Sequence, residues 1–182
     1  MPYVTTRFGA IFYLARGSAD VALMAVHGAG GTSRHWGHQL GALNDIARVI
    51  ALDLPGHGRS AGRALASVAA ATQCVLATMD ALDLPRAVLA GHSLGGAIAQ
   101  SVALTAPERC AGLVLIGTAA RLQRPALLDS LRQDWLATTQ RLTQLVYAPG
   151  TPAAILEAAT VDLRKTSPNT LDTDYASAAA AD

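Results

Sequence analysis

The chain has 182 residues, of which 51% are hydrophobic and 15% charged, and its formal net charge is +1 at pH 7. This length predicts one globular domain, no apolar run is long enough to span a membrane, and the scattered arginines form no basic surface for nucleic acid. The first ten residues lack the basic and apolar regions of a secretory signal, so we expect a cytoplasmic protein with neither a membrane nor a nucleic-acid partner.

The first predicted elements are strands. Residues 3–7 and 10–16 flank Gly9 and predict an antiparallel hairpin, and residues 21–26 predict a short buried strand that ends at HGAGGTS. The segments ARVIALDLPGHGRS, RAVLAGHSLGG and CAGLVLIGTAA repeat this pattern of an apolar run followed by a turn. Four such strands indicate a parallel sheet that is covered on both faces.

Helical periodicity is found between these strands. Apolar residues recur at helical spacing from Val68 to Leu82, with Ser67 as the capping residue, and a second helix follows Ser93. Strands that alternate with helices predict right-handed crossovers and an α/β fold of the doubly wound type.

After Arg121 the strand signal ends. Apolar residues at helical spacing predict two or three amphipathic helices, interrupted by YAPGTP and TSPNT. We therefore divide the chain into an α/β core, residues 1–120, and a helical cap or lid, residues 121–182. The apolar positions in this second part are Leu127, Leu128, Leu131, Trp135, Leu142, Leu145 and Val146.

The strongest chemical signal is the GxSxG pattern formed by Gly91, Ser93 and Gly95. It lies between a predicted strand and a predicted helix, where a sharp turn exposes the serine hydroxyl and small neighbours allow close approach of the backbone. The amide of Leu94 opens the helix without an intrahelical acceptor and is a natural donor to an oxyanion. The glycine-rich HGAGG loop supplies the second donor, with Ala29 as the first candidate. In that loop Gly30 is the next candidate.

Three segments in this order, VHGAGGTSRHW, ALDLPGHGRS and AGHSLGGAIA, resemble the oxyanion loop, the turn after the next strand and the nucleophile elbow of the α/β-hydrolase superfamily, in its capped esterase and lactonase branch. The resemblance covers residues 21–118. It implies a mostly parallel sheet with helices on both faces and a C-terminal helical cap. It also implies hydrolysis of a small carboxylic ester or lactone through an acyl-serine intermediate, without a cofactor.

Residue by residue, the resemblance implies that Ser93 is the nucleophile and that Leu94 and Ala29 are the oxyanion donors. His27 and Gly28 would position the oxyanion loop. The remaining motif residues would support the turns, and the histidines of the motifs would pack and form hydrogen bonds without acting as the base. These residues are Gly30, His57, Gly91, His92 and Gly95.

The triad partners are not found in this chain. In the superfamily the acid and the histidine follow the nucleophile, whereas all five histidines here precede Ser93. The later carboxylates, including Asp129, Asp134, Asp162, Asp172 and Asp174, end no apolar strand, so we assign no acid.

Two features lead us to expect a truncated hydrolase of impaired activity that lacks its last strands, its acid and its histidine. Residues 113–116 are apolar on both faces, as in a central strand, although an edge strand of this kind promotes aggregation. A cap also returns to the sheet at both of its ends, and the predicted cap is joined to it at one end only.

Other interpretations remain open. Ser93 is compatible with a simple helix cap, and GAGGTS followed by a strand ending in Asp53 imitates a dinucleotide-binding motif, although Ser33 stands where the third glycine belongs. A non-catalytic protein that binds a small molecule between core and cap is the main alternative.

The other candidate ligands of metals have simpler explanations. His35 and His38 are expected to pack or to lie in solvent, since no carboxylate or cysteine cluster accompanies them. Cys74 and Cys110 lack the spacing of a zinc site or a disulfide framework and are expected to be two buried thiols. We therefore expect no metal.

Overall fold

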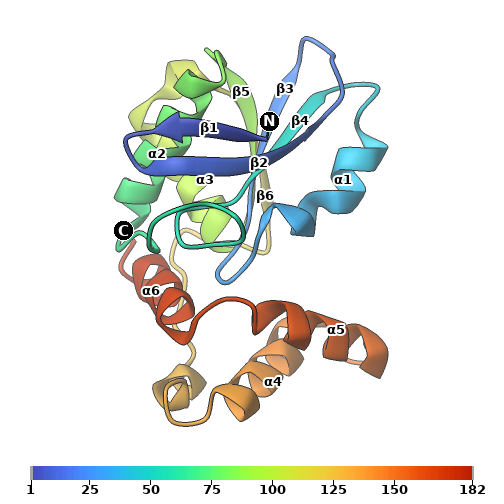
Figure 1. Cartoon of the computed structure of the whole chain (residues 1–182), viewed down its shortest axis with the longest axis vertical. Helices are drawn as coiled ribbons and strands as arrows, with labels where there is room; N and C mark the ends of the chain where they lie inside the picture. The colour runs from blue at the N-terminus through green and yellow to red at the C-terminus, as the bar shows by residue number, and fades with distance from the viewer. Residues whose placement is uncertain (1, 182) are drawn as a thin grey trace.

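A computed structural model describes residues 2–181 and contains one six-stranded sheet in the order β1-β2-β4-β3-β5-β6 (Figure 1). Strands β1 and β2 form the predicted antiparallel hairpin, β2 pairs antiparallel with β4, and β3 to β6 are parallel. The α/β class and the mostly parallel sheet are confirmed. The strands are β1 Tyr3–Thr6, β2 Gly9–Arg16, β3 Ala22–Val26, β4 Arg48–Leu52, β5 Ala87–His92 and β6 Cys110–Ile116.

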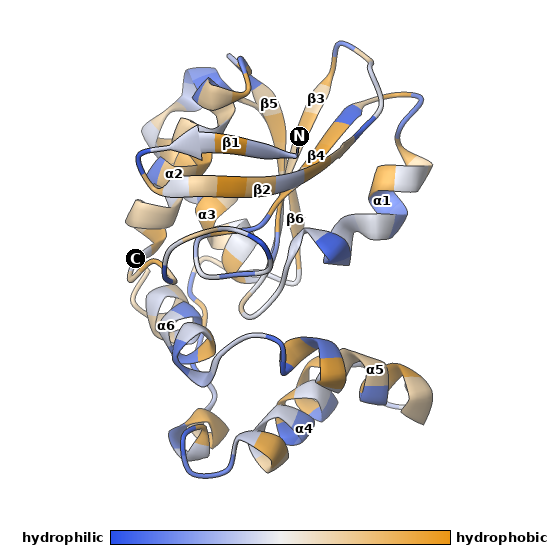
Figure 2. Ribbon diagram, viewed as in Figure 1, coloured by the Kyte–Doolittle hydropathy of each residue, from blue (hydrophilic) through white to orange (hydrophobic). Residues whose placement is uncertain are grey.

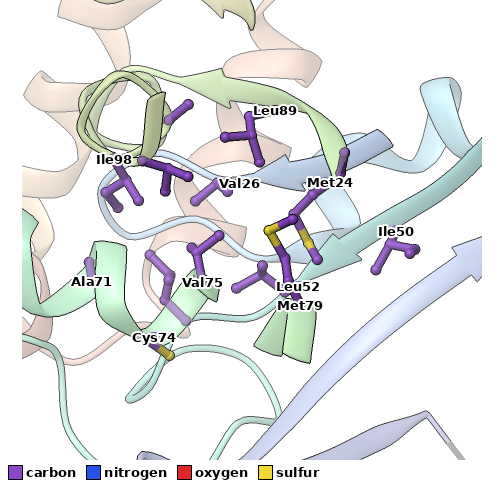
Figure 3. Close-up of a cluster of buried hydrophobic side chains, with 14 of the residues drawn as sticks. Met24, Val26, Ile50, Leu52, Ala71, Cys74, Val75, Met79, Leu89 and Ile98 are labelled. Carbon is purple, nitrogen blue, oxygen red and sulfur yellow. The ribbon is translucent and has the colours of Figure 1, made fainter. Parts of the chain in front are cut away.

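Helices cover both faces of the central strands because side chains alternate along each strand. Met24 and Val26 of β3 point toward helices α2 (Val68–Ala81) and α3 (Leu94–Thr105), whereas Ala25 packs on the opposite face with Trp36 and Leu40. Leu40 belongs to the short helix α1 (Gly37–Ala42), which follows a 3-10 turn at Ser33–Trp36. Figure 3 shows the larger cluster, in which labelled side chains of β3, β4 and β5 meet those of α2 and Ile98 of α3.

Some local predictions can be checked at single residues. The Ser67 hydroxyl accepts a hydrogen bond from the amide of Ala70 at 3.1 Å, so it caps α2 as predicted.

Both cysteines are free thiols, but only Cys74 is buried; Cys110 starts β6 and is half-buried, so the expectation of two buried thiols is correct for one. Burial raises the pKa of the Cys74 thiol to about 12, which makes it unreactive at neutral pH.

The C-terminal segment, residues 126–179, is helical and lies at one end of the sheet (Figure 1). Its helices break at Pro152 and Pro168, within the two predicted interruptions. Helix α4 carries both orange and blue residues, as expected for an amphipathic helix, whereas α5 is mainly apolar (Figure 2). The segment contains a 3-10 turn at Ala126–Ser130 and the helices α4 Trp135–Val146, α5 Ala153–Leu163 and α6 Pro168–Ala179.

This segment has a small core of its own. Leu128, Leu131, Leu142 and Leu171 are buried against one another, and Ala29 of the loop after β3 packs on them. No helix within residues 2–181 is long and apolar enough to cross a bilayer.

The sequence predicts that the parallel strands are covered on both faces, but strand β6 is partly exposed. Leu113, Val114, Leu115 and Ile116 are 40%, 41%, 44% and 43% exposed, because within residues 2–181 β6 pairs only with β5 and forms the edge of the sheet. An apolar edge strand with unpaired backbone groups is a template for pairing with another chain.

We expect the 182-residue chain to self-associate through this edge. Replacing Leu115 with lysine should weaken the association, because a charge on an edge strand opposes strand pairing. The measurement is light scattering after size-exclusion chromatography over a range of concentrations. Leu104→Lys is the matched control, since Leu104 is 83% exposed but lies on α3. A chain that stays monomeric at every concentration would contradict the prediction.

Candidate active site

Ser93 lies in the sharp turn between β5 and α3. Its backbone angles are φ 52° and ψ −118°, a conformation that L residues rarely adopt and that costs about 1–3 kcal/mol. The Ser93 amide donates to the carbonyl of Ile116 at 2.9 Å, which holds the turn against β6. The Ser93 side chain forms no capping hydrogen bond, which disfavours the simple helix-cap interpretation.

The glycines of the motif are required by close backbone approach. A Cβ on Gly91 would overlap the carbonyl oxygen of Gly95, and a Cβ on Gly95 would overlap the carbonyl oxygens of Val26 and His27. Helix α3 therefore starts directly against the end of β3. This packing places the turn at Ser93 next to the loop that follows β3.

The glycine-rich loop lies against the turn at Ser93. A Cβ on Gly28 would be 3.2 Å from the Cβ of Ser93. Within residues 2–181 the amides of Ala29 and Leu94 donate to no protein acceptor, whereas the amide of Gly30 donates to Asp174. The two preferred donor candidates are therefore free for an oxyanion, and the reserve candidate Gly30 is engaged.

His27 is buried beneath this loop and connects it to the end of β4. Its Nε2 accepts a hydrogen bond from the amide of Leu54 at 3.1 Å, so the proton is on Nδ1, which donates to the carbonyl of Gly28 at 2.8 Å. Burial, and then the neighbouring His57, lower the pKa of His27 well below its ordinary value. A neutral imidazole thus orients the loop, and both of its nitrogens are occupied.

The structure brings His57 and Asp174 together, which the sequence did not suggest. His57 Nε2 lies 2.7 Å from Asp174 Oδ2, and His57 Nδ1 lies 3.1 Å from the carbonyl of Pro55. Burial opposes protonation of His57, but Asp174, the Pro55 carbonyl and Asp53 outweigh it and raise the His57 pKa. Both nitrogens face acceptors, which favours the protonated form of His57. No local signal links two residues 117 positions apart.

From the opposite pKa shifts of His27 and His57 we expect the free energy of unfolding to be largest near neutral pH. Below about pH 6.5 the unfolded chain protonates His27 and the folded chain does not, so the free energy of unfolding falls as the pH falls. His57 has the opposite sign: its contribution is complete below about pH 6.5 and is lost as the pH rises through its raised pKa. Urea unfolding between about pH 5 and pH 9 measures both limbs.

His57→Gln should remove the alkaline decline, because glutamine does not titrate. His38→Gln is the matched control, since His38 is exposed. Stability that stays constant or rises above pH 6.5 in the unmodified chain would show that the pair of His57 and Asp174 is not ionised.

A cavity of about 910 Å³ opens above Ser93. Its floor contains Gly28, Ala29, Gly30, His92 and Ser93, so the structure brings five predicted site residues together. His27, Gly91, Leu94 and Gly95 are not among the residues that line this cavity. The walls come from the C-terminal helices and are mainly apolar: Leu142, Val146, Tyr147, Ala154, Ile155, Ala158, Ala159, Leu163 and Tyr175.

Polar groups gather at one wall. His35 Nε2 lies 3.2 Å from Asp162 Oδ2, and Asp162 also accepts from Lys165 at 2.7 Å. Partial burial and then the nearby His35 lower the pKa of His92, which has no hydrogen-bond partner within residues 2–181. His92 therefore borders the cavity and does not form the hydrogen bonds that the resemblance implied. His38 is exposed and does not line the cavity.

Asp53 is unsuited to the alternative of dinucleotide binding. Its buried carboxylate accepts hydrogen bonds from the amides of Ser33 at 2.6 Å and Arg59 at 2.8 Å. A carboxylate that already holds two loops together is not free for a ribose. Within residues 2–181 no group of three His, Cys, Asp or Glu side chains is placed to hold a metal ion.

Comparison with known proteins agrees with this geometry. Residues 21–170 match the family described as alpha/beta hydrolase fold. The chain is 39% identical over 154 residues to the dihydrolipoyllysine-residue acetyltransferase component of the acetoin cleaving system of Pseudomonas putida, covering 82% of this chain and 41% of that protein. It is 33% identical over 144 residues to the pimeloyl-[acyl-carrier protein] methyl ester esterase of Vibrio campbellii, covering 72% of this chain and 55% of that protein.

Among solved structures, a hydrolase from Pseudomonas aeruginosa PA01 superposes with a TM-score of 0.85 and 30% identity, over 99% of this chain and 72% of that one. The chain thus spans about half the length of these curated relatives and about three quarters of the solved structure.

Proposed function

The chain belongs to the α/β-hydrolase fold family, and from this membership we propose that Ser93 attacks a small carboxylic ester or lactone to form an acyl-serine. The observation that carries the proposal is the strained turn of Ser93 at the floor of a cavity, with two free amides beside it. A hydroxyl held in such a turn, without a capping role, is typical of a nucleophile.

The reaction follows from this arrangement. The Ser93 oxygen bonds to the carbonyl carbon, and the amides of Leu94 and Ala29 stabilise the negative oxygen that develops there. The bond to the alcohol oxygen then breaks, and the alcohol leaves with the proton that the Ser93 hydroxyl has given up. Water hydrolyses the acyl-serine, which releases the acid and restores the hydroxyl. Removing one oxyanion donor typically slows such a reaction about 100- to 1,000-fold.

The general base is the missing part. His27 and His57 are buried with both ring nitrogens occupied, and no histidine follows Ser93. His92 borders the cavity, but the family resemblance gives it no role as the base. We propose that the base and its acid are not supplied by these 182 residues. Without a triad, the oxyanion hole and binding alone leave roughly 10³- to 10⁴-fold acceleration over water. The isolated chain is therefore a slow esterase.

The cavity suggests the substrate class. Its walls from α4 and α5 are apolar, with Leu142, Val146 and Ile155 among them, so we propose an ester or lactone with an apolar acyl or alcohol group. The esterase named among the relatives acts on a methyl ester of an acyl chain, which is compatible with this wall. In this proposal residues 121–182 act as the cap that closes the cavity.

The test is labelling with a fluorophosphonate, in which a phosphorus–oxygen bond forms at Ser93 and fluoride leaves. We expect intact-mass spectrometry to show one label, peptide mapping to place it on Ser93, and Ser93→Ala to abolish it. Ser101→Ala is the matched control, because Ser101 lies on the same helix α3 outside this cavity. A folded chain that is not labelled but binds a small apolar ester saturably would support the alternative of a non-catalytic binding protein.

A further inference from the structure

We propose that Asp174 and Thr166 are positioning residues that hold the oxyanion loop, residues 27–31, through Gly30. The packing of the C-terminal helices on the core would then be coupled to the orientation of the oxyanion donors. This inference rests on the proposed function, because it assigns the loop the role of stabilising an oxyanion.

Both peptide groups of Gly30 are held by residues more than 130 positions away in the sequence. The Gly30 amide donates to Asp174 Oδ2 at 2.8 Å, and the Gly30 carbonyl accepts from Thr166 Oγ1 at 2.9 Å. Gly30 has a φ of 67°, and a Cβ there would lie 2.7 Å from the side chains of Leu163 and Leu171. Four residues of the C-terminal segment therefore converge on one glycine.

These contacts complete a set that fixes every peptide group from Gly28 to Gly31. The carbonyl of Gly28 shares a peptide group with the Ala29 amide, and it accepts from His27 Nδ1 at 2.8 Å and from the Gly31 amide at 3.0 Å. Since the carbonyl and the N–H of a trans peptide point in opposite directions, these bonds aim the Ala29 amide away from His27. Asp174 and Thr166 hold the next two peptide groups, on the other side of Ala29.

Asp174 is itself fixed by His57. The same Oδ2 atom accepts from His57 Nε2, and the side chains of His57 and Asp174 are only 1% and 4% exposed. A charge-assisted hydrogen bond in such a dry place holds the carboxylate in one position. The turn after β4, the loop after β3 and helix α6 thus meet at one carboxylate oxygen.

A purely structural role for Asp174 would be to anchor α6 to the core. That role would change stability alone. A positioning role also changes the mobility of the loop and the rate of bond formation at Ser93, with little effect on binding, because the oxyanion forms only in the transition state.

The experiment compares Asp174→Asn and Thr166→Val, in the full chain, with matched controls from the same segment. Asp172→Asn removes a carboxylate that pairs with Arg124 at 2.9 Å, and Thr173→Val removes a hydroxyl that bonds to the carbonyl of Asn169. Hydrogen exchange of peptides that span residues 27–31 reports loop mobility. Fluorophosphonate kinetics separate the saturation constant from the rate of bond formation.

We expect Asp174→Asn and Thr166→Val to speed exchange in the loop at least about tenfold and to slow bond formation about 10- to 100-fold, with the saturation constant nearly unchanged. The controls should match the unmodified chain. Thr166→Val keeps the side-chain volume, so it decides the question if Asp174→Asn does not fold.

Variants that fold, exchange and react like the unmodified chain would overturn the inference. If the unmodified chain is not labelled at all, the proposed function fails, and the exchange data alone still show whether Asp174 and Thr166 hold the loop.

Discussion

Replacing Gly95 with alanine is expected to destabilise the fold by about 3 kcal/mol or more. A Cβ at this position would overlap the backbone oxygens of Val26 and His27, and backbone atoms at the end of a central strand have no room to yield. Helix α3 would have to move away from β3. Because Ser93 precedes that helix directly, we also expect phosphonate labelling to be lost in any folded fraction.

Urea unfolding measures the change, and Gly41→Ala is the matched control. Gly41 lies in helix α1, and a Cβ there would meet nothing within 4 Å, so alanine at this position should stabilise the chain by about 0.5–1 kcal/mol. If the free energy of unfolding falls for Gly95→Ala and rises for Gly41→Ala, the overlap of the new Cβ with the backbone causes the loss at Gly95. Equal effects at the two positions would contradict it.

Replacing Ser93 with glycine is expected to abolish labelling and at the same time to raise the free energy of unfolding by about 1 kcal/mol. Glycine adopts the positive φ of this turn without the steric strain that serine bears, and the larger chain entropy of unfolded glycine offsets only part of the gain. The site would thus gain stability by losing its reactive group.

Ser93→Ala separates the two effects. It also removes the hydroxyl but keeps the Cβ that causes the strain, so labelling should vanish without the gain in stability. Thermal and urea unfolding of both variants, beside the unmodified chain, decide the matter. A glycine variant no more stable than the alanine variant would mean that the turn at Ser93 stores no strain.

Much of the site follows from local patterns. The glycines at 91 and 95 and the apolar run before them predict a strand, a sharp turn and a helix, and the structure has β5, Ser93 and α3 at these positions. The donor candidates Ala29 and Leu94 also follow from the sequence, since free amides at a helix start and in a glycine-rich loop are local properties. The roles of these residues in catalysis stay predictions.

The contacts of the C-terminal helices are not predictable in this way. In the sequence Asp174 is only a carboxylate outside any strand, yet it is buried between His57 and Gly30. His35 is exposed, as the sequence predicts, but no local pattern indicates that it borders the cavity beside Asp162. Periodicity reports which face of a helix is apolar, but it does not report which distant loop that face meets.

The order of strands and helices along the chain, the sharp turn at Ser93 and the family to which the chain belongs can be predicted from the sequence, because they depend on residues that are close along the chain. Three features require the folded chain: within residues 2–181 β6 is an exposed edge, the C-terminal helices line the cavity, and one carboxylate joins two loops to helix α6. The hydrogen bonds of that carboxylate join residues more than 100 positions apart, and the burial of apolar surface brings such residues together.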